Sequence, residues 1–364
     1  MNGSLSLYFA WINGYPLVTI MFVFLSLLCG LLASTLIFTL YKRRIDKIKK
    51  SWENEIAVLI MKAILYTEDD GDLKNIWSKS ESLLQNNRFR QEVINEILLA
   101  RKEVSGVSAA NLKVVYETLG FNHDSYRKLK NKKWHIKAKG AQELAIMEQK
   151  KYVKEIFRLT NHHNMYVRNE AQCALVNFYG FLGLRFLNVT VHQISEWQQI
   201  QLLNKLNGVT PKNFEMLKKW LNSSNDSVVV FALKLCTFYH RYELYENVIA
   251  CLLKTYVDVK LNVLTYMRNH FREDTASLLI DDYGFDNKTY QLAIIDTIAE
   301  IATEDQIPFL LKQLHHTDDD IKAAAAKALS MIHPSGSSFL QTHLFANENP
   351  WKSIFLQIQN DRAA

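Results

Sequence analysis

Glycine and proline are scarce in this chain of 364 residues, with 12 and 5 copies. Because both residues mark the turns between strands, their scarcity weighs against an all-β fold and excludes a collagen-like one. There are four cysteines, Cys29, Cys173, Cys236 and Cys251, without CxxC pairing. That spacing excludes a disulfide scaffold and the usual zinc sites, and it fits a reducing compartment. The composition is typical of long helices joined by short turns.

Charged side chains are absent before Lys42, and residues 17–41 form an uninterrupted apolar run. A helix of that length spans roughly 37 Å, enough to cross a hydrocarbon core of about 30 Å. A cleaved signal peptide would need a basic start and a small-residue cleavage site, and a core helix would carry a polar face. Residues 17–41 are therefore predicted to be an uncleaved transmembrane anchor, and residues 1–16 a short extracytoplasmic segment.

Positive charge is concentrated in two clusters, although the whole chain carries a net charge of +6. The first cluster, at residues 42–50, directly follows the apolar run. The positive-inside rule then predicts a single-pass inner-membrane protein with its N-terminus outside and residues 42–364 in the cytoplasm. Six basic residues are expected at the membrane interface: Lys42, Arg43, Arg44, Lys47, Lys49 and Lys50. The alternative is that they only stop translocation of the chain.

The second basic cluster, at residues 127–139, contains seven Lys or Arg residues and no acidic one. It is a candidate patch for an acidic protein partner or an anionic membrane surface, with an ordinary solvated face as the alternative. The rest of the chain is mildly acidic, so the basic face that coats nucleic acid is missing and no nucleic-acid partner is expected. The candidate patch residues are Arg127, Lys128, Lys130, Lys132 and Lys133.

A repeat of about 31 residues covers residues 134–333. Its first marker is mostly a β-branched residue, at Ile136, Val167, Trp197, Val228, Val259, Thr289 and Ile321. Its second marker, four residues later on the same helical face, is mostly small: Gly140, Ala171, Gln201, Ala232, Val263, Ala293 and Ala325. Asn, Asp and Ser precede the markers and can cap a helix. The pattern predicts stacked pairs of antiparallel helices that share one core.

These residues carry a family resemblance. Val167-Arg168 with Ala171 and Ala174-Leu175 resembles the HEAT repeat, and Asp318–Ile321 with Ala325 and Ala328-Leu329 is similar to its short bacterial variant. Trp197 and Gln201 depart from the pattern, and the TPR signature is absent. The resemblance implies an all-α fold in which the N-terminal transmembrane helix is followed by a right-handed α-solenoid. It also implies a protein-binding role. For Lys137, Arg168, Lys260 and Lys322 it implies a structural ladder with Asp and Asn residues of the turns, with a ligand role as the alternative.

The flanking segments are expected to be helical as well. Residues 42–133 form a basic juxtamembrane segment followed by a helical cap or degenerate repeats, with helices near 52–66, 73–86, 89–103 and 109–119. Residues 334–364 are expected to be C-terminal capping helices, because a proline starts an apolar stretch there. Trp134, Trp197 and Trp220 are expected in the core.

Catalytic motifs are missing, including GxGxxG, GxxxxGK[ST], HExxH and GxSxG. The pairs His162-His163 and His315-His316 both lie in predicted turns, and capping explains their polar neighbours better than a metal site does. No catalytic, cofactor-binding or metal-ligating residue is therefore assigned, and no cofactor is expected.

The sequence thus favours a non-enzymatic, membrane-anchored scaffold with a membrane-associated protein partner. The chain resembles bacterial single-span HEAT proteins, some of which accompany membrane glycosyltransferases in envelope polysaccharide synthesis. The alternative is an enzyme, or a nucleic-acid or nucleotide-binding protein, on a HEAT-like frame, since a fold does not fix a function.

Overall fold

The computed structural model describes residues 16–332 other than 66–80, Lys212, Asp286 and Ala302, together with Ser353 and Leu356. Within these residues it contains 17 α-helices and no strands, as the composition predicts. The chain folds into two compact units, Met1–Arg127 and Lys128–Ala364. The expected C-terminal capping helices lie outside the described residues, apart from Ser353 and Leu356, which are helical.

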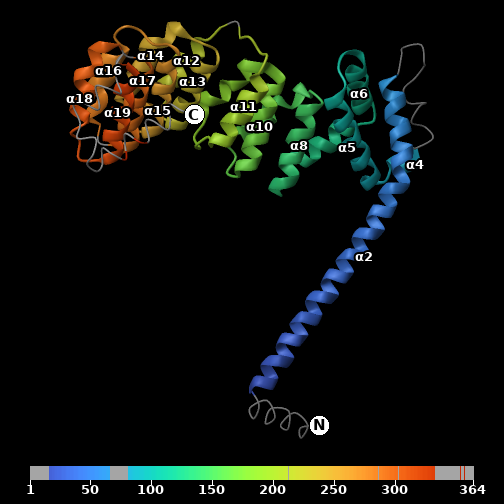
Figure 1. Ribbon diagram of the computed structural model, residues 1–364. Coiled ribbons are helices and arrows are strands. Elements are labelled where there is room, and N and C mark those ends of the chain that lie inside the picture. The colour runs from blue at the N-terminus through green and yellow to red at the C-terminus, as the bar shows by residue number, and fades with distance from the viewer. Residues whose placement is uncertain are drawn as a thin grey trace. The chain divides into compact units, whose positions relative to one another are not determined.

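The first unit is built on one long helix, which Figure 1 shows in blue as an uninterrupted rod. This helix, α2, spans Pro16–Ile64, so the helix expected near 52–66 continues the apolar run without a break. Its last three turns pack against α5 and α6, through Ile56, Leu59, Ile60 and Ala63, which are buried. The other helices of this unit are α4 (Glu81–Leu84), α5 (Asn87–Glu103), α6 (Gly106–Thr118) and most of α7 (Phe121–Leu129).

The second unit alternates longer and shorter helices. The longer ones are α8 (Trp134–Ile146), α10 (Met165–Tyr179), α11 (Glu196–Leu206), α13 (Asp226–Phe238), α15 (Val257–Asn269), α17 (Lys288–Ile301) and α19 (Asp319–Ile332). The shorter ones are α9 (Val153–Arg158), α12 (Glu215–Leu221), α14 (Tyr245–Ile249), α16 (Thr275–Asp281) and α18 (Ile307–Gln313).

The longer helices of the second unit begin at regular intervals of 30 or 31 residues along the chain. Neighbouring longer helices pack together in the pairs α8–α10, α10–α11, α13–α15, α15–α17 and α17–α19. The short helices α9, α12, α16 and α18 each pack against the longer helix that follows them. This packing buries both markers in four of the predicted copies: Val167 with Ala171, Val228 with Ala232, Val259 with Val263, and Ile321 with Ala325.

Polar side chains cap several of the longer helices, as the turn sequences predict. Asn164 accepts from the backbone N–H groups of Tyr166 and Val167 at the start of α10. Asn225 accepts from Ser227 at the start of α13, and Ser195 forms a reciprocal capping box with Gln198 at the start of α11. Each cap satisfies backbone donors that have no partner within the helix.

Two of the predicted markers are wrong by one residue. Thr289 is exposed, and Tyr290 beside it is buried; Trp197 is exposed, and Gln198 is buried. One residue turns a helix by about 100°, so a shift of one moves the predicted marker off the core face. The second markers in α11 and α17 shift by one residue as well. Leu202 is buried and the predicted Gln201 is half-buried, and Ile294 is buried while the predicted Ala293 is half-buried.

The prediction that three tryptophans lie in the core is right for one of them. Trp220 is 1% exposed, whereas Trp134 is 44% exposed and Trp197 is 54% exposed. Trp134 is the first residue of α8 and Trp197 the second of α11.

Candidate functional site

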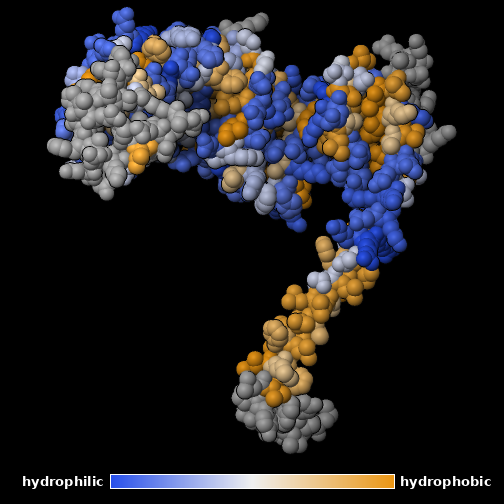
Figure 2. Space-filling view, in the orientation of Figure 1, coloured by the Kyte–Doolittle hydropathy of each residue, from blue (hydrophilic) through white to orange (hydrophobic). Residues whose placement is uncertain are grey.

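The apolar half of α2 is exposed along its length. Large apolar side chains from Ile20 to Tyr41 are exposed, and Figure 2 shows them as a continuous orange band on the rod. Three hydroxyl groups within this half bond to carbonyl oxygens of their own helix: that of Ser26 donates to Val23, that of Thr35 to Leu32, and that of Thr39 to Thr35. These internal bonds suit an apolar solvent, where no water satisfies a hydroxyl group. By length and composition, α2 is able to cross a membrane.

The basic residues predicted at the membrane interface follow directly on the same helix. All six are exposed, and in Figure 2 the band changes from orange to blue at this point of the rod. Lys49 forms an ion pair with Glu92 of α5, with 2.9 Å between Nζ and Oε1. A basic side chain on a rod that leaves an apolar span can extend its charge toward anionic headgroups.

Contacts between α2 and the start of α5 join the apolar span to the folded unit. The ring of Trp52 meets Phe89 edge-on, with 5.3 Å between ring centroids, and Phe89 is fully buried. The guanidinium of Arg88 lies 3.5 Å from the hydroxyl of Tyr41, which it can reach as a donor. No flexible linker separates these residues from the span, since all of α2 is one helix.

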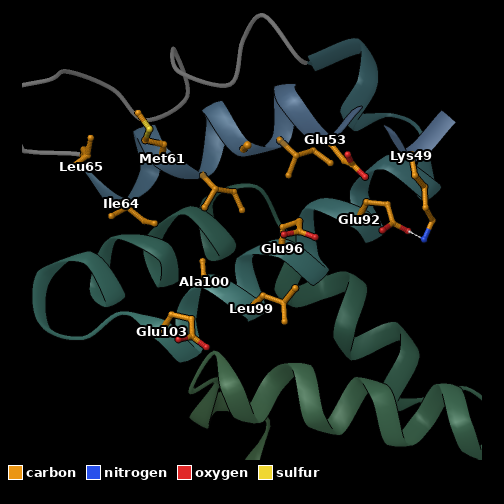
Figure 3. Close-up of a pocket in the computed structure, with 13 residues that line it drawn as sticks. Lys49, Glu53, Met61, Ile64, Leu65, Glu92, Glu96, Leu99, Ala100 and Glu103 are labelled. Atoms are coloured by element: carbon orange, nitrogen blue, oxygen red, sulfur yellow. Dashed lines mark ion pairs between the residues drawn. The ribbon is translucent and has the colours of Figure 1, made fainter. Parts of the chain in front are cut away.

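An open groove of about 770 Å³ runs between α2 and α5 in the first unit (Figure 3). Its lining is largely apolar and includes Ile60, Met61 and Leu99. Carboxylates stand along it, from Glu53 on α2 and from three residues of α5: Glu92, Glu96 and Glu103. The only sign of this groove in the sequence is that Glu92 and Glu96, four residues apart, share one face of a helix.

The basic residues of the 127–133 patch differ in their partners and in their exposure. Arg127 pairs with Asp124 in the same helix turn. Lys128 is not part of an open patch, because its ammonium bonds both carboxylate oxygens of Glu143, at 2.6 and 2.8 Å, and Glu143 is almost fully buried. A buried carboxylate needs such a partner, which gives Lys128 a structural role. Lys130, Lys132 and Lys133 are exposed.

Four basic side chains near the helix starts of the second unit contact turns or helix ends, in their own helix pair or in a neighbouring one. Arg168 donates to the carbonyl oxygens of His162 and His163, both at 2.9 Å. Lys260 is buried, donates to the Leu252 carbonyl at 2.6 Å, and pairs with Asp282 at 2.8 Å. Lys322 pairs with Asp319, and Lys137 contacts His162.

Neither histidine pair is placed for metal binding. Among the described residues, no group of three or more His, Cys, Asp or Glu side chains is arranged to hold a metal ion. The rings of His162 and His163 lie close together at a tilt of 32°, with 4.1 Å between centroids. In each pair one imidazole accepts a backbone N–H two residues later, from Asn164 and from Asp318.

Comparisons with protein-family models and with curated proteins find no match for this chain. The functional assignment therefore depends on the residues themselves: an apolar span, a basic segment, and a helical unit built on the same helix.

Proposed function

We propose that this protein is a non-enzymatic scaffold, anchored by α2 in the inner membrane, that presents a helical binding surface at the cytoplasmic face. The continuity of α2 carries the proposal. Residues with exposed apolar side chains and residues such as Ile56 and Leu59, which form the core of the first unit, belong to one helix. A protein that only needed to be tethered could use a flexible linker, whereas a continuous helix keeps the folded unit close to the bilayer.

The orientation rests on charge. Residues 1–41 carry no charged side chain, and six exposed basic residues follow at 42–50. Under the positive-inside rule this asymmetry favours an external N-terminus and a cytoplasmic array. In that orientation the basic segment lies against anionic headgroups, which add about 1 kcal/mol of attraction per basic residue.

For the second unit we propose an α-solenoid of HEAT-like helix pairs. Helix starts at intervals of 30 or 31 residues support this, as does the packing of neighbouring longer helices. The basic residues that bond to turns, Arg168 and Lys260 among them, occupy the positions expected from the HEAT-like pattern. Solenoids of this kind present long surfaces to protein partners.

Anchoring would raise the effective concentration of the array toward other membrane proteins. We therefore propose a membrane-associated protein partner. A role beside a membrane glycosyltransferase in envelope polysaccharide assembly is the specific form of this proposal, and it rests on the resemblance to bacterial single-span HEAT proteins.

Two measurements on the full chain test the proposal. C-terminal fusions should give fluorescence with a reporter that folds in the cytoplasm and no activity with alkaline phosphatase. Crosslinking in intact cells, followed by detergent extraction, should capture a stoichiometric membrane protein. A chain with residues 17–41 deleted should lose that partner. Phosphatase activity without fluorescence would overturn the topology, and equal capture by the deleted chain would overturn the role of the anchor.

A further inference from the structure

Two hydrogen-bond donors face each other between α8 and α10. The Nδ1 atom of His162 accepts the backbone N–H of Asn164 at 3.1 Å, so this nitrogen carries no hydrogen. A neutral imidazole then carries its hydrogen on Nε2. The ammonium of Lys137 can only donate hydrogen bonds, and its Nζ lies 3.4 Å from that same Nε2. An acceptor that reached both groups would satisfy two donors at once.

The charges around this point are positive. His163 and Arg168 flank His162, and Arg168 bonds the carbonyl oxygens of both histidines. The pKa of His162 lies below its ordinary value because of burial first, and then because of its electrostatic interaction with His163, Lys137 and Arg168. The environment of this half-buried ring therefore favours an anion as the missing acceptor.

The corresponding turn before α19 has the same hydrogen-bond pattern, but it carries carboxylates. There His316 accepts the backbone N–H of Asp318 at 3.0 Å, and Asp318 caps the helix as Asn164 does for α10. Lys288 pairs with Asp318 at 2.7 Å and with Asp320 at 2.6 Å. The α19 turn thus supplies its own carboxylates, while the α10 turn has Asn164 and Tyr166 at those places.

A stacked aromatic pair lies one helical turn from the Lys137–His162 contact. Trp134 of α8 and Tyr166 of α10 are parallel to within 23°, with 5.1 Å between ring centroids. Trp134 precedes Lys137 by three residues, so both side chains share a face of α8. Both rings are about half exposed, so each keeps apolar surface available to a flat group.

We propose that the starts of α8 and α10 form a binding site for a nucleoside phosphate. Lys137, His162 and Arg168 would surround the phosphoryl group with donors and positive charge, and the base would lie against the Trp134–Tyr166 pair. A tetrahedral oxyanion accepts several charge-assisted hydrogen bonds at once, and bases of any kind stack on aromatic side chains. The site goes beyond the proposed scaffold role and is independent of it.

Titration calorimetry on the full chain in non-ionic detergent tests this site. Adenosine and uridine monophosphates are the probes, with inorganic phosphate and adenosine as partial ligands. Both monophosphates should bind more tightly than either partial ligand. Lys137→Gln and Trp134→Ala should each weaken binding about tenfold or more, the effect of losing one charge-assisted or stacking contact.

The sharpest variant is Asn164→Asp, which keeps the helix cap and places a carboxylate among the cations. It should abolish binding without lowering the melting temperature. Trp197→Ala and Lys288→Gln, the matched controls at α11 and α17, should bind as the unaltered chain does. Undetectable binding of both monophosphates, or unchanged binding by Asn164→Asp, would overturn the site. Inorganic phosphate binding as tightly as the monophosphates would overturn the role of the aromatic pair.

Discussion

Trp52 of α2 meets Phe89 of α5 edge-on, at 87° between ring planes. The contact lies eleven residues after Tyr41, the end of the apolar run, and four residues before Ile56, which is buried in the first unit. It therefore links the membrane span to a folded core through about three turns of helix.

Leu59→Ala should destabilise the first unit by about 2–5 kcal/mol, because the side chain is 4% exposed and its loss leaves a cavity. Val58→Ala is the matched control, because the Val58 side chain, next to Leu59 in the sequence, is 53% exposed. Thermal melts of the full chain in detergent, followed by circular dichroism, measure both. Equal melting temperatures for the two variants would show that the end of α2 is not part of the core.

Lys260→Met should destabilise the second unit by about 1–3 kcal/mol, because it leaves the partly exposed Asp282 without its cation. Asp282 also accepts from the Tyr290 hydroxyl at 2.6 Å. The double variant Lys260→Met with Asp282→Asn should recover part of that loss, because no unpaired charge remains. Chemical unfolding of the unaltered chain, both single variants and the double variant measures the coupling. Additive effects of the two substitutions would contradict an ion pair.

The sequence predicts the helical class and the anchor, because both follow from composition and from a run of uncharged residues. It places the marker correctly at Val167, Val228, Val259 and Ile321, where a buried valine or isoleucine leads the helix. It fails at Trp197 and Thr289, where the adjacent Gln198 and Tyr290 take the buried position. Gln198 is polar and Tyr290 is not β-branched, so neither fits a search for β-branched residues.

Only part of the candidate basic patch could be predicted from the sequence, because a count of charges does not show which of them are paired. Lys128 and Lys132 are indistinguishable in a charge count, yet Lys128 bonds Glu143, which lies fifteen residues along the chain on α8. Such a pairing depends on how side chains from different helices meet in the folded chain. The groove between α2 and α5 and the Trp134–Tyr166 pair likewise depend on packing between helices.

Replacement of Lys132 and Lys133 with Gln tests whether the exposed part of this run binds an anionic surface. If it does, the full chain in detergent should associate with vesicles rich in anionic lipid less as salt rises, and the double variant should associate more weakly at low salt. Lys128→Gln instead should lower the melting temperature, because it removes the cation that faces the buried carboxylate of Glu143. Equal vesicle association by the double variant at low salt would identify an ordinary solvated face.

Three cysteines should be unreactive in the folded protein. Burial raises the pKa of the Cys173 and Cys251 thiols to about 11 and that of Cys236 to about 12. At pH 8 the reactive thiolate is then scarce and shielded. A Cys29→Ser chain should react with a thiol reagent only after denaturation, which a colorimetric assay measures. Rapid reaction of the native chain would contradict the burial of these side chains.

The central claim is that α2 spans a membrane and continues into the folded unit. Alkaline carbonate extraction of cell membranes tests it most directly, because that treatment releases peripheral proteins and retains those with a spanning helix. The full chain should remain in the membrane pellet, and a chain that begins at Ser51 should be found in the supernatant. Release of the full chain by carbonate would contradict the account.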